Sequence, residues 1–584
     1  MVVDALLKDA LVFNVFLKRW DRCDVVIHRG RFLYVGKVEG MGFQSEETRD
    51  CGGKPLIPGL IDIHLHIEST LCTPVPFARA VAERGVTTVV SEPHEIANVF
   101  GVRGIQEMIR ASKGAAADVY YGVPSSVPAT SSDLETSGGV VGLEELDRLF
   151  RDEPKVICLG EVMNCPDLIA MGPSRAAEFI DYMRREQPFA AVEGHCPSYK
   201  GLDLAKVLYM GVDSDHCLQD VEGLEQRLAN GMFVEIQEKA VTPEIVDCLL
   251  AHDTDGLFCF VTDDVPPNVL VAKGHLDHVL RKALEAGMPL EKAVIAATWS
   301  PARRMGFRDR GAIAPGKVAD AVLLADRSAD FTVEAVFKGG VPVSRCQTAE
   351  AGCGETFPED FYQSIRLPGE LPDTLFELAA PQGASKVCCR TMEKNNLTTY
   401  TREGRLTLPV EEGRVSWEEA PCNLALVIER HTGKAGAGKG IMTGCIFQGG
   451  AVATSYAHDS HNLLVAGDRA SDMKMAASWV VRNQGGICVV RKGEVVASLA
   501  LPVAGLLSED PMPEIAARVA RIQQAMEELG FVHPNPLMSF ATLTLPVSPA
   551  LKLTDKGLVD VGSSTLVELF VKAASGGEVS HLES

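Results

Sequence analysis

Two histidines separated by one residue follow an apolar segment near the N-terminus. The segment runs Ile57-Pro-Gly-Leu-Ile-Asp-Ile-His-Leu-His-Ile-Glu-Ser69 and ends with His64 and His66. Residues two apart on a β-strand point to the same side, so both imidazoles could bind one metal ion while Leu65 packs elsewhere. A single pair of this kind is more often two ordinary polar residues than a metal site. The remaining ligands must therefore come from other parts of the chain.

Four further side chains that commonly bind metals stand at the ends of later apolar runs. They are Glu161, His195, His216 and Asp263. With the two histidines they make six nitrogen and oxygen ligands, about what two divalent ions sharing a bridging carboxylate require. Taken singly, Glu161 could be a buried carboxylate paired with a base, and each histidine could be an ordinary core residue. Their joint occurrence favours the metal site.

The elements that would position these ligands are eight strand-like runs, each ending in a polar residue and alternating with helical segments. Such alternation predicts a parallel sheet covered by helices, and eight units predict an α/β (β/α)8 TIM-like barrel with its chemistry at the carboxyl ends of the strands. The predicted strands are Gly59–His66, Thr87–His94, Asp118–Ser125, Lys155–Glu161, Phe189–His195, Gly211–His216, Met232–Gln237 and Leu257–Asp263.

The sequence on each side of the predicted barrel contains short apolar runs that alternate with turn signals, and neither side has a core of its own. We therefore expect residues 1–55 and 308–350 to form one small composite β-sandwich, into which the barrel, residues 56–307, is inserted. Further on, strand-like runs surround two helix candidates, at 472–483 and 513–529, which predicts a separate C-terminal α+β domain over residues 370–584.

The composition of the chain argues against some classes of binding partner. The net charge of -22 over 584 residues disfavours nucleic acid and anionic membrane surfaces, which would repel the chain. No apolar stretch approaches the roughly 20 residues that span a bilayer. The 16 cysteines form no Cys-x-x-Cys pair and no signal peptide is recognisable, so we expect a cytoplasmic protein. A small neutral or cationic substrate fits this composition, and we also expect a homo-oligomer, a dimer or larger.

Several motifs resemble those of the prokaryotic adenine deaminases of the amidohydrolase superfamily, and the likeness covers nearly the whole chain. Besides the first strand, they are Glu92-Pro-His-Glu-Ile-Ala-Asn98, Ser125-Ser-Val-Pro-Ala129, Gly160-Glu-Val-Met-Asn164, Gly194-His-Cys-Pro197, Ser214-Asp-His216, Thr262-Asp-Asp264, Ala297-Thr-Trp-Ser-Pro301 and Ala457-His-Asp-Ser-His-Asn462.

The resemblance implies a binuclear site and a hydrolytic deamination. His64, His66 and Asp263 would hold one metal, His195 and His216 the other, and Glu161 would bridge them. Family members use iron or manganese more readily than zinc, although the ligand types permit all three. A metal-activated water would attack C6 of adenine and Asp263 would carry its proton to the leaving ammonia, giving hypoxanthine. The predicted catalytic residues are thus Asp263, Glu161 and His216.

A second group of polar residues is predicted to bind the small-molecule purine or to orient the ligands. Glu68 could instead be a loop carboxylate, and Asp264 a turn residue. His458 and His461 could cap the barrel mouth, bind an extra ion, or form a buried polar turn. The predicted substrate-binding residues are Glu68, Glu92, His94, Glu95, Gln237 and Asp264.

Three positions depart from the family pattern as we know it. Cys217 stands where Glu usually follows Ser-Asp-His, Gln237-Glu238 where Arg-Glu is usual, and Glu92 where Asp is common. Because polar recognition is sensitive to each partner, a 6-substituted purine or another cyclic amidine is an alternative substrate. A cyclic amidohydrolase is a further alternative, although such enzymes usually bridge their metals with a modified Lys where this chain has Glu161. An inactive binding protein is a third.

Overall fold

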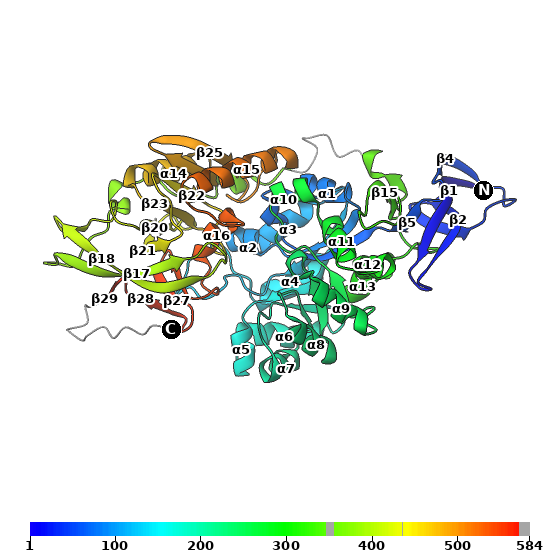
Figure 1. Ribbon diagram of the computed structural model, residues 1–584, viewed down its shortest axis with the longest axis horizontal. Coiled ribbons are helices and arrows are strands. Elements are labelled where there is room, and N and C mark those ends of the chain that lie inside the picture. The colour runs from blue at the N-terminus through cyan, green and yellow to red at the C-terminus, as the bar shows by residue number, and fades with distance from the viewer. Residues whose placement is uncertain (346–355, 369, 435, 572–584) are drawn as a thin grey trace.

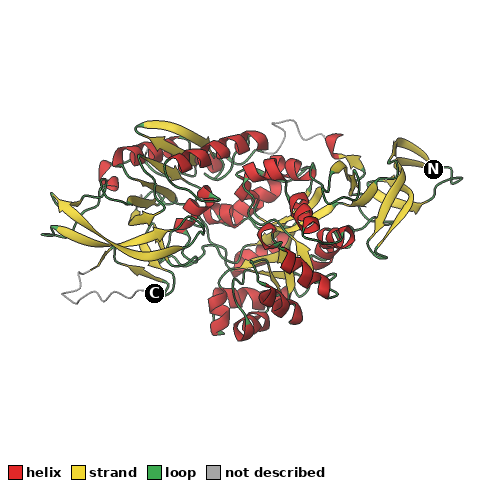
Figure 2. Cartoon of the chain, viewed as in Figure 1, coloured by secondary structure: helices red, strands yellow, loops and turns green. Residues whose placement is uncertain are grey.

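The computed structural model describes residues 1–345, 356–368, 370–434 and 436–571. Figure 1 shows three parts side by side: a small sheet that contains the N-terminus, a central barrel with its helices, and a C-terminal domain at the opposite end. Helices surround the central part and also lie along the C-terminal domain, whereas the N-terminal end consists mainly of strands (Figure 2). The predicted domain limits at 350 and 584 lie outside the described residues.

The small sheet draws strands from both flanks of the barrel. Its order is β16-β15-β14-β5-β1-β2-β3, with β4 beside β1. Ala321 of β14 pairs with Pro58 of β5, so hydrogen bonding crosses the predicted limit between residues 55 and 56. A sandwich made from this sheet stays a prediction. The strands are β1 Val2–Asn14, β2 Arg19–His28, β3 Arg31–Gly36, β4 Gln44–Asp50, β5 Pro55–Pro58, β14 Ala321–Leu324, β15 Val333–Lys338 and β16 Val341–Pro342.

The central part is a closed ring of eight parallel strands. Two parallel sheets, ordered β10-β9-β8-β7-β6 and β11-β12-β13, meet where Asp213 N donates to Val192 O at 3.2 Å and where Asp263 N donates to His64 O at 3.0 Å. The predicted α/β TIM-like barrel is confirmed. The strands are β6 Leu60–Leu65, β7 Val86–Ser91, β8 Asp118–Val123, β9 Val156–Val162, β10 Ala191–Gly194, β11 Ser214–Asp215, β12 Phe233–Ile236 and β13 Phe258–Phe260.

Helices cover the outside of the ring, and α9 shows why one of them begins where it does. Pro243 opens α9 behind Thr242, whose hydroxyl accepts from Ile245 N at 3.3 Å, because a proline at the first turn loses no needed donor. The helices are α1 Pro74–Ala82, α2 His94–Phe100, α3 Val102–Ala111, α4 Leu143–Asp152, α5 Cys165–Ala170, α6 Arg175–Glu186, α7 Gly201–Met210, α8 Val221–Ala229, α9 Pro243–Ala251, α10 Pro267–Lys273, α11 Leu276–Glu285, α12 Leu290–Ala297 and α13 Trp299–Arg304.

The C-terminal domain is built on a ten-stranded sheet. Its order is β19-β18-β17-β21-β20-β23-β22-β24-β25, with β29 beside β17. The strands are β17 Lys386–Lys394, β18 Thr401–Glu411, β19 Arg414–Val415, β20 Asn423–Ile428, β21 Ala437–Gly444, β22 Gly450–Thr454, β23 Leu463–Gly467, β24 Gly486–Arg491, β25 Glu494–Ala500 and β29 Phe570–Val571, and a separate small sheet holds β26 Leu551–Thr554, β27 Gly557–Asp560 and β28 Thr565–Val567.

Helices cover both faces of the large sheet. Leu424 and Leu426 of β20 join the core beneath α14 (Ala470–Arg482), whereas the alternate residues Ala425 and Val427 join the core shared with α15 (Met512–Glu528) and the barrel. The shorter α16 spans Pro536–Ala541. The helices predicted at 472–483 and 513–529 are thus present within two residues at each end.

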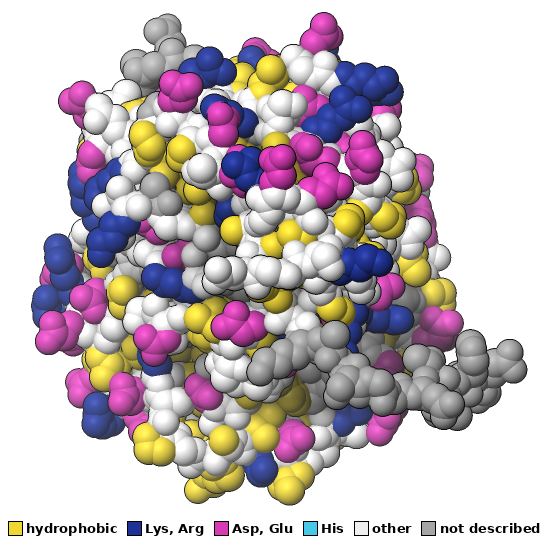
Figure 3. Space-filling model, turned by 90° about the vertical axis from the view of Figure 1, so that its left-hand side faces the viewer, with side chains coloured by type: hydrophobic (Ala, Val, Ile, Leu, Met, Phe, Trp, Pro, Cys, Tyr) yellow, Lys and Arg dark blue, Asp and Glu magenta, His cyan; other side chains and the backbone are white. Residues whose placement is uncertain are grey.

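The C-terminal domain packs directly against the barrel. Asn268 of α10 donates to Gln523 of α15 at 2.8 Å, and the Thr136 hydroxyl donates to Asp555 at 2.6 Å. Because one continuous core also joins the two parts, the interface is a fixed structural feature. Basic and acidic side chains intermingle on the outer face of this domain (Figure 3). Among the described residues, no helix combines the length and apolar character that crossing a bilayer requires.

Candidate functional site

All six predicted metal ligands come together at the carboxyl ends of the barrel strands. His64 ends the apolar run of β6, Glu161 lies near the end of β9, and His195 directly follows β10. His216 follows β11, and Asp263 lies three residues beyond the end of β13. The parallel strands bring these residues to one rim because they run in the same direction.

Glu161 is the centre of the group. Its Oε2 lies 2.9 Å from His195 Nδ1 and 3.3 Å from His216 Nε2, while its Oε1 lies 3.6 Å from His66 Nε2. One carboxylate thus faces histidines from three different strands, one oxygen toward each side. This is the arrangement that a bridging carboxylate needs.

Asp263 occupies the opposite side of the group. Its Oδ1 lies 3.5 Å from His66 Nε2 and 3.7 Å from His64 Nε2, and its Oδ2 accepts a 2.7 Å hydrogen bond from Gln237 Nε2. The backbone of Asp263 is left-handed, with φ at 57°, a conformation that is uncommon for a residue with a side chain. The same residue closes the barrel through its N–H to His64 O, which fixes it against β6.

The protonation of Glu161 and His216 suits the binding of a cation. Burial alone would raise the pKa of Glu161, but His195, His216 and His66 hold it well below its usual range. Burial, together with His64, lowers the pKa of His216 to about 4, which favours a neutral imidazole that can bind a metal. His64 Nε2 is buried without a hydrogen-bond partner among the described residues. These donors therefore fit divalent metal ions.

A buried ion pair holds the backbone behind two of the ligands. Asp215 Oδ1 accepts from the backbone N–H groups of Cys196 and Cys217, both at 3.0 Å, and these residues directly follow His195 and His216. Arg227 Nε donates to Asp215 Oδ2 at 2.6 Å. The role of Asp215 was missed from the sequence, although it lies within the Ser214-Asp-His216 motif.

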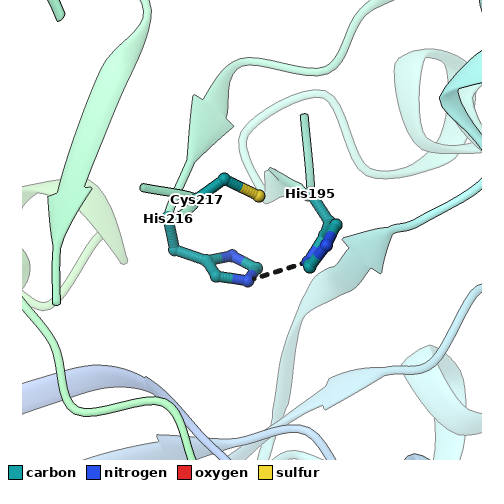
Figure 4. Close-up of side chains that lie close together, drawn as sticks. All are labelled: His195, His216 and Cys217. Atoms are coloured by element: carbon teal, nitrogen blue, oxygen red, sulfur yellow. Dashed lines mark hydrogen bonds between the residues drawn. The ribbon is translucent and has the colours of Figure 1, made fainter. Parts of the chain in front are cut away.

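Cys217 brings a sulfur to the same place, which sequence reasoning did not foresee. Its Sγ lies within ligand range of the His195 and His216 rings, which face each other with Nδ1 and Nε2 3.1 Å apart (Figure 4). Burial raises the pKa of the Cys217 thiol to about 12. Glu235 of β12 similarly approaches His64 and His216.

Glu92, predicted to bind substrate, lies behind the ligands instead of facing the rim. Its Oε2 accepts from Glu161 N at 2.6 Å, and its backbone carbonyl lies 3.0 Å from His66 Nδ1. The residue therefore fixes both a ligand backbone and an imidazole orientation. Gly160 leaves room for it, because a Cβ at that position would lie 2.4 Å from Glu92 Cδ.

Four other predicted substrate-binding residues lie toward the C-terminal domain. His94 was predicted to end a strand, but β7 stops at Ser91 and His94 is the first residue of α2. Glu68 lies in a 3₁₀ turn, Ile67–Thr70, and burial with the charge of Glu95 raises its pKa to about 8. Asp264 accepts a hydrogen bond from the Ser69 hydroxyl. Here Glu95 meets His458 and His461 of the C-terminal domain.

The comparisons with known proteins agree with this geometry. Residues 56–167 and 190–343 match the amidohydrolase family, and residues 398–565 match the adenine deaminase C-terminal domain. A relative named adenine deaminase 2 from Shouchella clausii (strain KSM-K16) is 44% identical over 98% of this chain and 100% of its own length. The chain belongs to the adenine deaminase family.

Another family member and one solved structure illustrate the range of the likeness. The adenine deaminase of Clostridium perfringens (strain ATCC 13124) is also 44% identical, over 98% of this chain and 100% of its own length. A β-aspartyl dipeptidase structure from Fervidobacterium islandicum AW-1 is 18% identical and aligns with a TM-score of 0.45, covering 61% of this chain and 98% of its own.

Proposed function

We propose that this protein catalyses the hydrolytic deamination of adenine, which yields hypoxanthine and ammonia. The observation that carries the proposal is 44% identity, over 98% of the chain, to relatives named adenine deaminase. The six clustered ligands at the barrel rim supply a site where this chemistry can take place. The enzyme is thus a metal-dependent hydrolase of the amidohydrolase family.

We infer that two divalent ions belong to the site. His64, His66 and Asp263 would hold one, His195 and His216 the other, with Glu161 between them; in support, Asp263 faces His64 and His66, and Glu161 Oε2 faces His195 and His216. Manganese or iron is our proposal, with zinc permitted by the same ligand types. Such ions, when bound, lower the pKa of a water molecule toward neutrality and so supply a nucleophile.

Asp263 is the residue that moves protons in this proposal. Gln237 fixes its Oδ2, and the histidines around it hold its pKa well below the usual range against the effect of burial. The carboxylate accepts a proton from the attacking water and donates it to the departing amino nitrogen of adenine, which leaves as ammonia. Without that proton the amino group would be a poor leaving group.

The two most exposed of the six ligands are His195 and Asp263. The His195 side chain is 38% exposed and that of Asp263 18%, whereas His64, His66, His216 and Glu161 are at most 5% exposed. We infer that adenine enters past His195 and Asp263. Gln237 and Cys217, close to these two residues, are then the side chains available to contact the purine.

The proposal is tested by measuring ammonia release from adenine and a panel of other purines with manganese- or iron-loaded protein. Hypoxanthine should form, and Asp263→Asn should lower kcat by roughly 10²–10⁴-fold, the usual contribution of a positioned acid–base group. The exposed Asp247 of α9 provides a matched control, Asp247→Asn. Full turnover by metal-loaded Asp263→Asn would exclude the proton-transfer role, and turnover of another purine without adenine would exclude the substrate.

A homo-oligomer and a cytoplasmic location remain predictions from the sequence. Size-exclusion chromatography with light scattering measures the first, and a single-chain mass would contradict it. Cell fractionation measures the second.

A further inference from the structure

A second group of metal-binding side chains lies between the barrel and the C-terminal domain. His94 and Glu95 begin α2, and His458 and Asp459 belong to the segment between β22 and β23. We call these four residues the interdomain cluster. It shares no side chain with the six ligands at the barrel rim, although the His94 ring contacts the His66 ring edge-to-face at 4.7 Å.

The interdomain cluster is buried, and each of its two carboxylates has one oxygen without a hydrogen-bond partner among the described residues. Glu95 is fully buried, and its Oε2 lies 2.8 Å from His461 Nε2, whereas its Oε1 has no hydrogen-bond partner among the described residues. Asp459 Oδ2 is likewise buried without such a partner. A buried carboxylate with an unpaired oxygen is unfavourable unless a nearby positive charge compensates it. A positive charge at the centre of the cluster would therefore stabilise it.

The separations within the cluster are those of ligands around one ion. His458 Nδ1 lies 3.4 Å from Asp459 Oδ1 and 3.5 Å from Glu95 Oε2. His94 Nε2 lies 3.7 Å from Glu95 Oε1 and 3.9 Å from Asp459 Oδ1. Two ligands of a tetrahedral ion lie about 3.4 Å apart when each bond is about 2.1 Å long. Small movements of the side chains would bring all four to that geometry.

His461 also lies near Glu95, but the tautomer of its neutral ring distinguishes it from the four proposed ligands. The backbone N–H of Ala457 donates to His461 Nδ1 at 3.2 Å, so Nδ1 is the acceptor nitrogen and Nε2 carries the hydrogen of the neutral ring. Nε2 lies 2.8 Å from Glu95 Oε2. A histidine in this tautomer orients a carboxylate ligand and does not itself bind the ion.

We propose that the interdomain cluster binds a further divalent metal ion that fastens the C-terminal domain onto the barrel. His94 Nε2, His458 Nδ1 and the carboxylates of Glu95 and Asp459 are the ligands, two from each side of the interface. Two imidazoles and two carboxylates suit zinc, manganese or iron. The two carboxylates balance the charge of the ion, and the complete set of four protein ligands is typical of a structural site.

The competing interpretation is an ion-pair network without metal. A protonated His458 between Glu95 and Asp459 would also place positive charge in the cluster, at the same distances. The two interpretations differ in stoichiometry. A network leaves the protein with only the ions at the rim, whereas a metal adds one equivalent per chain.

The test counts metal in the full-length protein. Protein stripped with a chelator is incubated with excess Zn²⁺, freed of unbound ion by gel filtration, and analysed by plasma mass spectrometry. Wild type should retain three equivalents, and His458→Gln and Asp459→Asn two each. His533→Gln, which removes another buried histidine of the same domain, should retain three. The same metal content in wild type and in both cluster variants would refute the further site.

A second measurement does not depend on whether the variants fold. An anomalous difference map from crystals of the Zn²⁺-loaded wild type should show a peak between His94 and His458, apart from those at the rim, and a map without it would overturn the proposal. Neither readout involves turnover. Failure to deaminate adenine would therefore count against the proposed function and leave this inference intact.

Discussion

Gln237 Nε2 donates a 2.7 Å hydrogen bond to Asp263 Oδ2 and leaves Oδ1 facing His64 and His66. One oxygen of the carboxylate is therefore fixed by an amide and the other faces the imidazoles. An amide at position 237 is neutral and donates, so it orients the carboxylate without adding charge. The sequence predicted Gln237 as a purine contact, and the geometry adds a role in positioning Asp263.

Removing this hydrogen bond should lower turnover more than binding. We expect Gln237→Ala to reduce kcat roughly 10–100-fold, the usual effect of losing a group that orients a ligand. Gln237→Glu places a second carboxylate against Asp263, and repulsion between like charges raises the pKa of Asp263. The acidic limb of the kcat/KM profile should then move to higher pH. Steady-state kinetics of ammonia release across the pH range measure both effects.

A glutamine elsewhere in the barrel supplies the control for this pair. Gln106 of α3 donates to Glu153 at 3.0 Å, away from the metal ligands. Gln106→Ala should leave kcat and the pH profile as in wild type. Unchanged kinetics in both Gln237 variants would mean that Asp263 needs no such partner.

Much of this site could be predicted from sequence because strand ends are local features. An apolar run that stops at His64 or Asp263 predicts both a strand and the side chain at its end, and parallel strands bring the ends together. The position of Glu92 could not be predicted, because its contact with Glu161 N depends on how β7 and β9 each pair with β8, which lies between them. Cys217 was noted as a departure, but its closeness to His195 is a matter of three-dimensional geometry.

The contacts that the C-terminal domain makes with the barrel were also harder to predict, because they join residues far apart in the sequence. The sequence marked His458 and His461 as unusually polar, yet their meeting with Glu95 spans more than half of the chain. No local periodicity encodes a contact of that range. The large sheet was predicted only as α+β, because the order of ten strands depends on pairings between distant segments.

The close approach of Gly160 to Glu92 gives a steric test of the ligand backbone. A methyl group at position 160 would lie 2.6 Å from Glu92 Oε2, which accepts from Glu161 N. Gly160→Ala should displace Glu161 and weaken metal affinity roughly 10–100-fold. Competition with a fluorescent chelator measures the affinity. Gly172→Ala, whose added Cβ would meet no atom within 4 Å, is the matched substitution and should bind metal as wild type does.

Metal removal should affect both activity and stability. The proposed nucleophile depends on the bound ions, so dialysis against a chelator should abolish ammonia release. An ion present at about 1,000 times its Kd stabilises the folded state by about 4 kcal/mol. Calorimetry should therefore show a lower Tm for the stripped protein, restored together with activity by Mn²⁺ or Fe²⁺. A stripped protein with full activity would contradict the metal-dependent mechanism.

Glu135 is a buried carboxyl group that should make the free energy of unfolding depend on pH. Burial raises its pKa from 4.5 to about 7, although the N–H and hydroxyl of Thr130 both donate to its Oε1. The folded state therefore binds a proton more tightly than the unfolded state does. Between these two pKa values the folded chain carries one extra proton, so stability falls as pH rises.

Replacing Glu135 with glutamine should remove that dependence. As pH rises from about 4.5 to 7, the free energy of unfolding of wild type should fall by on the order of 3 kcal/mol relative to that of Glu135→Gln. Each pKa unit corresponds to about 1.4 kcal/mol. The amide keeps an acceptor for Thr130 but cannot ionise. Urea unfolding at a series of pH values measures the difference, and Glu144→Gln, on the exposed side of α4, should follow the wild-type curve. Parallel curves for wild type and Glu135→Gln would show that Glu135 does not titrate in this range.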